Sequence, residues 1–163
     1  MVFVSLGTQD MPFTRLLAMV EEAIDQGVIQ EEVIAQVGCT NYQGNKIKTF
    51  EYCDQATMDQ YVEQASYIIT HGGTGSIVGA LKKGKKVIAV SRLAKYGEHN
   101  NDHQLQIISQ FVDTEYILEC QDGGSMSECI SSLQNFQPRQ FISNTKNVLS
   151  YLEEYIDGIL GGN

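Results

Sequence analysis

The chain has 163 residues, a length typical of one domain that buries a sizeable core. Its formal net charge of -9 and isoelectric point near 4.7 argue against nucleic-acid binding, because contact with a phosphate backbone normally needs a basic face. No apolar run approaches the roughly 20 residues of a membrane span, so any membrane contact is expected to be peripheral.

Segments with strand-like and helix-like patterns alternate along the chain. Apolar runs predict strands at 2–6, 32–37, 47–52, 67–70, 87–90 and 116–118. Apolar residues at helical spacing predict helices at 13–26, 58–65, 76–83, 101–113, 125–134 and 144–160. The alternation predicts an α/β fold, with a mainly parallel sheet between two layers of helices, in a single domain covering 1–163.

The cysteines and the start of the chain indicate a cellular compartment. The four cysteines lie far apart without a CxxC pair, which is typical of reduced thiols in a cytoplasmic protein. The first apolar run is too short for a signal peptide and has no basic flank. We therefore expect a cytoplasmic location.

Three polar loops follow predicted strands. In an open parallel sheet, ligands bind beyond the carboxyl ends of the strands, near the point where the strand order reverses. The first loop is Gly7-Thr8-Gln9-Asp10, the second is residues 71–76, and the third is residues 91–104. Together they form the candidate ligand site.

The second loop, HGGTGS, joins a strand to a helix and predicts a phosphate site. Free N–H groups and the helix dipole at a helix N-terminus favour an anion. Three glycines would let a phosphate approach, and two hydroxyls could cap the helix or donate to phosphate oxygens. A structural turn with a capped helix is the alternative. The residues are His71, Gly72, Gly73, Thr74, Gly75 and Ser76.

Two further features bear on this loop. Gly79, inside the predicted helix, favours a functional role for this loop, because glycine there is unfavourable relative to alanine by about 1 kcal/mol and usually marks close packing. The pattern G-x-G-x-x-x-G is one residue longer than the dinucleotide fingerprint, but Arg92 after the next strand would suit the 2′-phosphate of NADP. An NADP-binding module therefore stays open as an alternative.

The third loop carries groups that can hold a sugar. Glu98 could accept two hydroxyl protons, and Asp102, His103 and Gln104 fall in the first turn of the following helix. A metal site is a second interpretation, because His99 and His103 are four residues apart with two carboxylates beside them. A capped helix with solvated polar residues is a third.

Three stretches carry a resemblance to a known family: VSLGTQDMPFTRLL, ITHGGTGSIVGALKKGKKVIAV and SRLAKYGEHNNDHQLQ. From Met1 to about Val112, the chain resembles the C-terminal domain of glycosyltransferase family 28. More narrowly, it resembles the single-domain subunits of split bacterial enzymes that build capsular polysaccharide and exopolysaccharide. Those subunits are similar to the catalytic subunit of the eukaryotic two-part dolichol-linked N-acetylglucosaminyltransferase.

The resemblance implies a Rossmann-like three-layer sandwich, the C-terminal donor-binding half of a GT-B glycosyltransferase. That half binds a UDP-sugar and transfers the sugar with inversion, without a metal or other cofactor. The resemblance implies that residues 71–76 take the diphosphate and that Gly7-Thr8-Gln9 closes on it. Glu98, Asp102, His103 and Gln104 would hold ribose and sugar hydroxyls, and Arg92 or Lys95 would stabilise the leaving diphosphate. A noncatalytic UDP-sugar-binding protein is the alternative.

Other expectations concern the chemistry and the partner. Many relatives carry a ribose-binding glutamate where this chain has Gly79, and Glu98 is the proposed substitute. Asp10 and His71 are the candidate general bases. The acceptor is expected to be a lipid-linked saccharide, held by a membrane-associated partner subunit that would place the chain at the membrane surface. The apolar stripe of the predicted helix 144–160 would contact this partner or pack on its own sheet.

Overall fold

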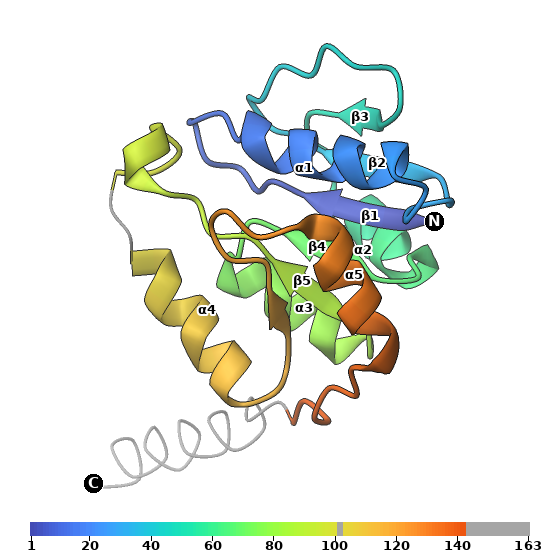
Figure 1. Ribbon diagram of the computed structural model, residues 1–163, viewed down its shortest axis with the longest axis vertical. Helices are drawn as coiled ribbons and strands as arrows, with labels where there is room; N and C mark the ends of the chain where they lie inside the picture. The colour runs from blue at the N-terminus through green and yellow to red at the C-terminus, as the bar shows by residue number, and fades with distance from the viewer. Residues whose placement is uncertain (101–102, 143–163) are drawn as a thin grey trace, which may run out of the picture.

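The structure, a computed structural model, describes residues 1–100 and 103–142. Its strands form one six-stranded parallel sheet in the order β3-β2-β1-β4-β5-β6, with helices on both faces (Figure 1). The open parallel sheet and its helices confirm the predicted α/β fold. The strands are β1 (Val2–Ser5), β2 (Val33–Gln36), β3 (Lys48–Phe50), β4 (Ile68–Thr70), β5 (Val87–Ala89) and β6 (Leu118–Glu119).

Five predicted helices are present with shifted ends. They are α1 (Thr14–Asp25), α2 (Gln55–Gln64), α3 (Thr74–Lys82), α4 (His103–Asp113) and α5 (Met126–Asn135). A short 3-10 turn, Ala94–Tyr96, precedes α4. Helix α2 starts three residues before the predicted Met58, because Asp54 caps it by accepting a hydrogen bond from the Thr57 N–H at 2.7 Å. The predicted helix 144–160 lies outside the described residues.

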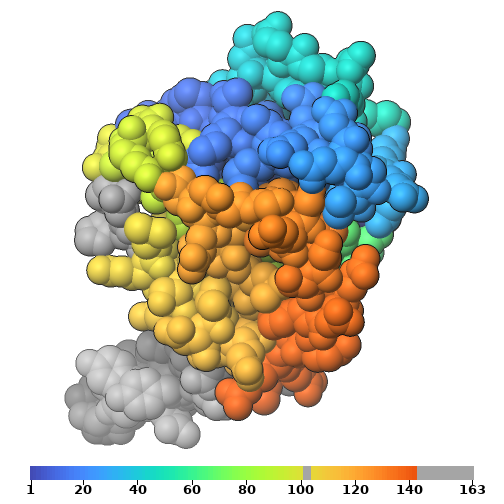
Figure 2. Space-filling model, viewed as in Figure 1, coloured from blue at the N-terminus to red at the C-terminus, as the bar shows by residue number. Residues whose placement is uncertain are grey.

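Two apolar clusters occupy the two faces of the sheet. Helices α1 and α5 lie side by side over one face, the face seen in Figure 2. Helices α2, α3 and α4 cover the other face. Alternate residues of β1 divide between the clusters: Val2 and Val4 pack toward α1, and Phe3 packs toward α2 and α3. The sheet therefore has a separate apolar cluster on each face.

The strand order reverses between β1 and β4, and this reversal positions the site. From β1 the chain builds outward through β2 and β3, then returns to place β4 on the other side of β1. Ser5 and Thr70 pair at the carboxyl ends of these two strands. The loop after β1 and the glycine loop after β4 therefore lie next to each other, at the kind of switch point where open α/β sheets bind ligands.

Stacked aromatic rings set the position of α2. The Tyr61 ring stacks against the rings of Phe3 and Phe50, at centroid distances of 5.5 and 5.1 Å, and these two rings lie 6.4 Å from each other. These contacts join α2 to β1 and to the edge strand β3, so the helix is fixed beside α3. Within residues 1–100 and 103–142, no helix is long and apolar enough to cross a membrane.

Candidate functional site

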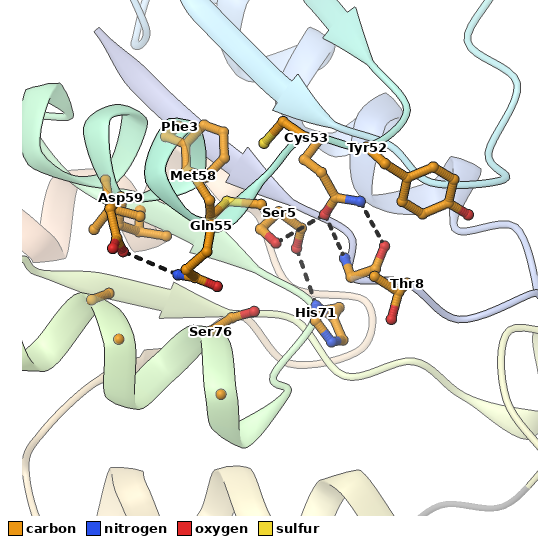
Figure 3. A pocket seen from close by; sticks show the side chains of 17 residues that line it. Phe3, Ser5, Thr8, Tyr52, Cys53, Gln55, Met58, Asp59, His71 and Ser76 are labelled. Carbon is orange, nitrogen blue, oxygen red and sulfur yellow. Dashed lines mark hydrogen bonds between the residues drawn. The ribbon is translucent and has the colours of Figure 1, made fainter.

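A cavity of about 300 Å³ opens at the strand reversal and extends between α2 and α3 (Figure 3). Phe3, Val62 and Ile68 give it an apolar floor. Polar residues also line it, among them Thr8, Gln55, Asp59, His71 and Ser76. The cavity thus combines an apolar floor with polar walls, a composition typical of small-molecule sites.

The first turn of α3 forms one end of the cavity. Gly73 is the N-cap residue and makes no side-chain cap, so the expected capping by Thr74 or Ser76 is not seen. The first backbone bond of the helix runs from the Ile77 N–H to the Gly73 carbonyl at 3.1 Å. The N–H groups of residues 74–76 precede that bond and have no acceptor inside the helix. This turn can therefore bind an anion such as phosphate.

The imidazole ring of His71 explains two glycines of the site. A Cβ at Gly73 would lie 2.4 Å from His71 Nε2, and a Cβ at Gly7 would lie 2.5 Å from His71 Cε1. Side chains are excluded at both positions by a ring of the protein itself. The His71 ring is thus a second reason for glycine at position 73, beside the predicted access for a phosphate.

The other glycines of the turn differ from this pair. Gly72 has φ of +85°, and a Cβ there would lie 2.3 Å from Ile108 Cδ1, so both backbone conformation and packing require glycine. Cβ atoms built at Gly75 and Gly79 meet nothing within 4 Å, and both glycines line the cavity. The expectation of close packing at Gly79 is therefore wrong: its missing side chain widens the cavity.

His71 itself is held as a neutral acceptor. Its Nδ1 lies 3.2 Å from the Ser5 carbonyl oxygen and 3.3 Å from the Thr70 hydroxyl oxygen. The carbonyl can only accept and the hydroxyl can also accept, so the proton is assigned to Nδ1 and the lone pair to Nε2. Burial lowers the pKa of His71 to about 4, and the nearby Arg92 charge adds to this lowering. Because a general base works best with a pKa near the operating pH, His71 suits hydrogen-bond acceptance better than proton abstraction.

Gln36 organises the loop after β1, and the sequence analysis missed it. Its amide nitrogen donates to the carbonyls of Gly7 at 2.8 Å and Glu51 at 3.0 Å. Its amide oxygen accepts from the Gly7 N–H at 3.1 Å and from the Ser5 hydroxyl at 3.2 Å. The Gly7 N–H is thus already bonded within the protein. A glutamine at the end of the apolar run EEVIAQV was the available signal.

The remaining residues of the first loop lie in different places. Thr8 is exposed and lines the cavity, as the candidate site requires. The Gln9 carbonyl accepts a hydrogen bond from the Cys39 thiol at 3.3 Å. Asp10 is exposed, and neither Gln9 nor Asp10 lines the cavity.

Arg92 is buried, which corrects its assignment to a ligand phosphate. The side chain is 1% exposed and its guanidinium stacks 4.8 Å from the Phe13 ring centroid. Its nitrogens donate to the carbonyls of Leu6 at 2.8 Å and Met11 at 2.7 Å. Arg92 therefore ties the loops after β1 and β5 together, and the feature that favoured NADP is removed.

Glu98 is also used inside the protein. It is 4% exposed, and its two oxygens accept from Arg15 Nε at 2.9 Å and Nη2 at 2.8 Å. It also accepts from the Leu93 N–H at 3.0 Å. The predicted contact of Glu98 with ribose is therefore not supported, and Arg15, on α1, is a residue that sequence reasoning missed.

Other predicted residues of the third loop have structural contacts or lie outside the description. The Gln104 side-chain oxygen accepts from the Arg92 N–H at 3.3 Å. Lys95 pairs with Asp122. Asp102 and the His103 side chain are not among the described parts of the chain. Within those parts, no three His, Cys, Asp or Glu side chains gather as metal ligands would.

Comparisons with known proteins agree with this fold. The chain is 27% identical over 81 residues to the UDP-N-acetylglucosamine transferase subunit ALG13 of Candida albicans, spanning 50% of this chain and 26% of that protein. It therefore covers about a quarter of the length of this curated relative.

Solved structures resemble the chain at low identity. The NMR structure of ALG13 has a TM-score of 0.59 at 21% identity, covering 87% of this chain and 89% of that one. The glycosyltransferase SnogD from Streptomyces nogalater has a TM-score of 0.58 at 18% identity, covering 81% and 34%. MurG of Acinetobacter baumannii has a TM-score of 0.54 at 16% identity, covering 81% and 40%.

These neighbours confirm that the chain has the Rossmann-like fold of a GT-B glycosyltransferase half. The sequence match to a family is broader than any of these single alignments. Residues 1–157 match the glycosyltransferase family 28 C-terminal domain. The chain therefore belongs to the glycosyltransferase family 28 C-terminal domain family.

Proposed function

We propose that the chain binds a UDP-sugar in the cavity between α2 and α3 and transfers the sugar, with inversion, to a lipid-linked saccharide. One observation carries this proposal: the unbonded first turn of α3 opens onto a cavity with an apolar floor at the strand reversal. A nucleotide has both matching parts, a diphosphate for the helix terminus and a flat base for the apolar floor.

The proposed site has one end for the diphosphate. We propose that the N–H groups of residues 74–76 and the hydroxyls of Ser76 and Thr8, which both line the cavity, donate to the leaving diphosphate. Negative charge develops on that group as the sugar bond breaks, so donors already in place stabilise the transition state. The chemistry needs no metal in this proposal.

The acceptor must come from another surface. Transfer requires an acceptor hydroxyl at the anomeric carbon, on the side opposite the leaving diphosphate, and a base to take its proton. Asp10, exposed in the loop after β1, is the proposed base of this chain. We propose that a membrane-associated partner subunit holds the acceptor, as the word subunit in the name of the Candida albicans relative suggests. The chain would then act at the membrane surface in capsular or exopolysaccharide synthesis.

Nucleotide binding tests the first part of this proposal. We expect UDP and UDP-sugars, but not NAD or NADP, to raise the melting temperature. A ligand at 100 times its Kd should stabilise the fold by about 2.7 kcal/mol. Stabilisation by NADP alone would contradict the proposal.

Turnover tests the second part. We expect the isolated chain to bind UDP-sugar and transfer it poorly, and co-expression with the acceptor-binding partner to restore transfer. Binding without transfer in the presence of that partner would instead identify a noncatalytic UDP-sugar-binding protein.

A further inference from the structure

The α2 side of the cavity presents a carboxylate, Asp59, whose contacts with Gln55 and Lys83 both fall on one oxygen atom. Among the described residues that line the cavity, Asp59 is the one with a negative charge. Gln55, one turn earlier, donates from its amide nitrogen to Asp59 Oδ1 at 3.1 Å, and Figure 3 shows the two side chains together on α2. Lys83 Nζ lies 3.6 Å from the same oxygen. A carboxylate has about four acceptor sites, so Asp59 keeps capacity for a ligand.

The wall of the cavity formed by α3 has no side chain at Gly79, across from Asp59. Gly79 on α3 lines the same cavity, and a Cβ there would meet nothing within 4 Å. Gly79 is four residues beyond Gly75, which places it about 6 Å further along the helix axis. A ligand with its phosphate at the first turn of α3 therefore has its next unit beside Gly79, on the side of Asp59.

In a nucleotide that next unit is the ribose, with two neighbouring hydroxyl groups. An acidic side chain is a common partner of ribose hydroxyls in nucleotide-binding folds. Glu98 is not available for this contact, because it is buried, does not line the cavity and is paired with Arg15. Asp59 is available for the contact, because it lines the cavity and Gln55 orients its carboxylate.

We infer that Asp59, held by Gln55, binds the ribose hydroxyls of the donor across the gap left by Gly79, and so selects ribonucleotides. This inference rests on the proposed UDP-sugar function. It assigns the ribose contact to α2 and not to α3 or to the loop after β5.

The test compares UDP with 2′,3′-dideoxy-UDP by calorimetric titration in the wild type, Asp59→Asn and Glu63→Gln. Glu63 is the matched control: it lies one turn further on α2, pairs with the same Lys83 at 2.6 Å, and does not line the cavity. We expect Asp59→Asn to weaken UDP binding about 10- to 100-fold, the range for hydrogen bonds to a charged group. Binding of the dideoxy nucleotide should change less than threefold, and Glu63→Gln should leave both affinities unchanged.

The outcomes separate this inference from the proposed function. If the wild type binds UDP but Asp59→Asn weakens both nucleotides equally, or neither, the ribose assignment is overturned while the UDP site stands. If Glu63→Gln has the same effect as Asp59→Asn, the cause is the charge near Lys83, and the assignment is again overturned. If the folded wild type binds neither nucleotide, the proposed function fails, and the inference fails with it.

Discussion

Replacing Gly73 with alanine tests whether the glycine turn is built around the His71 ring. Gly73 has φ of -66° and ψ of 132°, which alanine adopts freely, so backbone strain does not contribute. The new Cβ would lie 2.4 Å from His71 Nε2 and 2.9 Å from Cε1. The ring also has little room to move toward Gly7, where an added Cβ would lie 2.5 Å from its Cε1.

The expected loss of stability follows from these contacts. Overpacking of this kind typically destabilises by about 1 to 3 kcal/mol. If the ring swings outward instead, it loses the bond to the Ser5 carbonyl, a net loss of about 0.5 to 1.5 kcal/mol. We therefore expect Gly73→Ala to lower the free energy of unfolding by about 2 kcal/mol.

Gly79→Ala is the matched control in the same helix. Its Cβ meets nothing within 4 Å, and alanine is favoured over glycine inside a helix by about 1 kcal/mol. Urea denaturation, with the m-value held common, should therefore show opposite signs for the two substitutions. In a His71→Ala background the penalty of Gly73→Ala should fall by about half or more, because the clashing ring is gone and only the weaker N-cap preference of alanine remains.

Two results would refute this reasoning. One is a Gly73→Ala variant within about 0.5 kcal/mol of the wild type, the usual range for neutral surface changes. The other is an equal penalty with and without the His71 ring. If the reasoning holds, lost UDP binding in a Gly73 variant does not by itself locate a phosphate, because the free protein is already perturbed.

Three further predictions concern buried polar groups. The pKa of His71 is about 4 in the folded protein and 6.5 ordinarily, so between these values the unfolded chain binds a proton that the folded protein does not. The free energy of unfolding should therefore fall by at most about 3 kcal/mol as the pH drops from 6.5 toward 4. The stability difference between the wild type and His71→Gln, measured by urea denaturation, should therefore shrink across that window, and a constant difference would contradict the pKa. Gln36→Leu should destabilise the fold by about 2 to 4 kcal/mol, since it leaves the Gly7 N–H and carbonyl without their partner. A melting temperature within 2 °C of the wild type, roughly 1 kcal/mol or less, would show that the hydrogen bonds of Gln36 are dispensable. Glu98→Gln should destabilise the fold by about 2 to 4 kcal/mol, because it breaks the pair with Arg15. The control Glu119→Gln, in the same region, should destabilise it by less than about 1 kcal/mol. Equal melting temperatures for the two variants would refute a structural role for Glu98.

Local patterns in the sequence were enough to predict the fold. Apolar runs and helical spacing indicated every described strand and α-helix within a few residues. A strand buried on both faces leaves a short continuous apolar run, and an amphipathic helix leaves apolar residues at helical spacing. The ends shifted where a single capping bond decided them, as at Asp54. The glycine loop, the loop after β1 and their place at the carboxyl ends of the strands also followed from local order along the chain.

What the charged residues do was decided only by the tertiary structure. Arg92 and Glu98 have the chemistry of ligand contacts, yet both are buried and bonded to groups of the protein. The partner of Glu98, Arg15, is 83 residues away in the sequence. A residue type states what a side chain can bind, but its partner depends on which groups the folded chain brings within about 3 Å. That proximity is set by the packing of α1 and the loop after β5 against the sheet, so it cannot be predicted from a local sequence pattern.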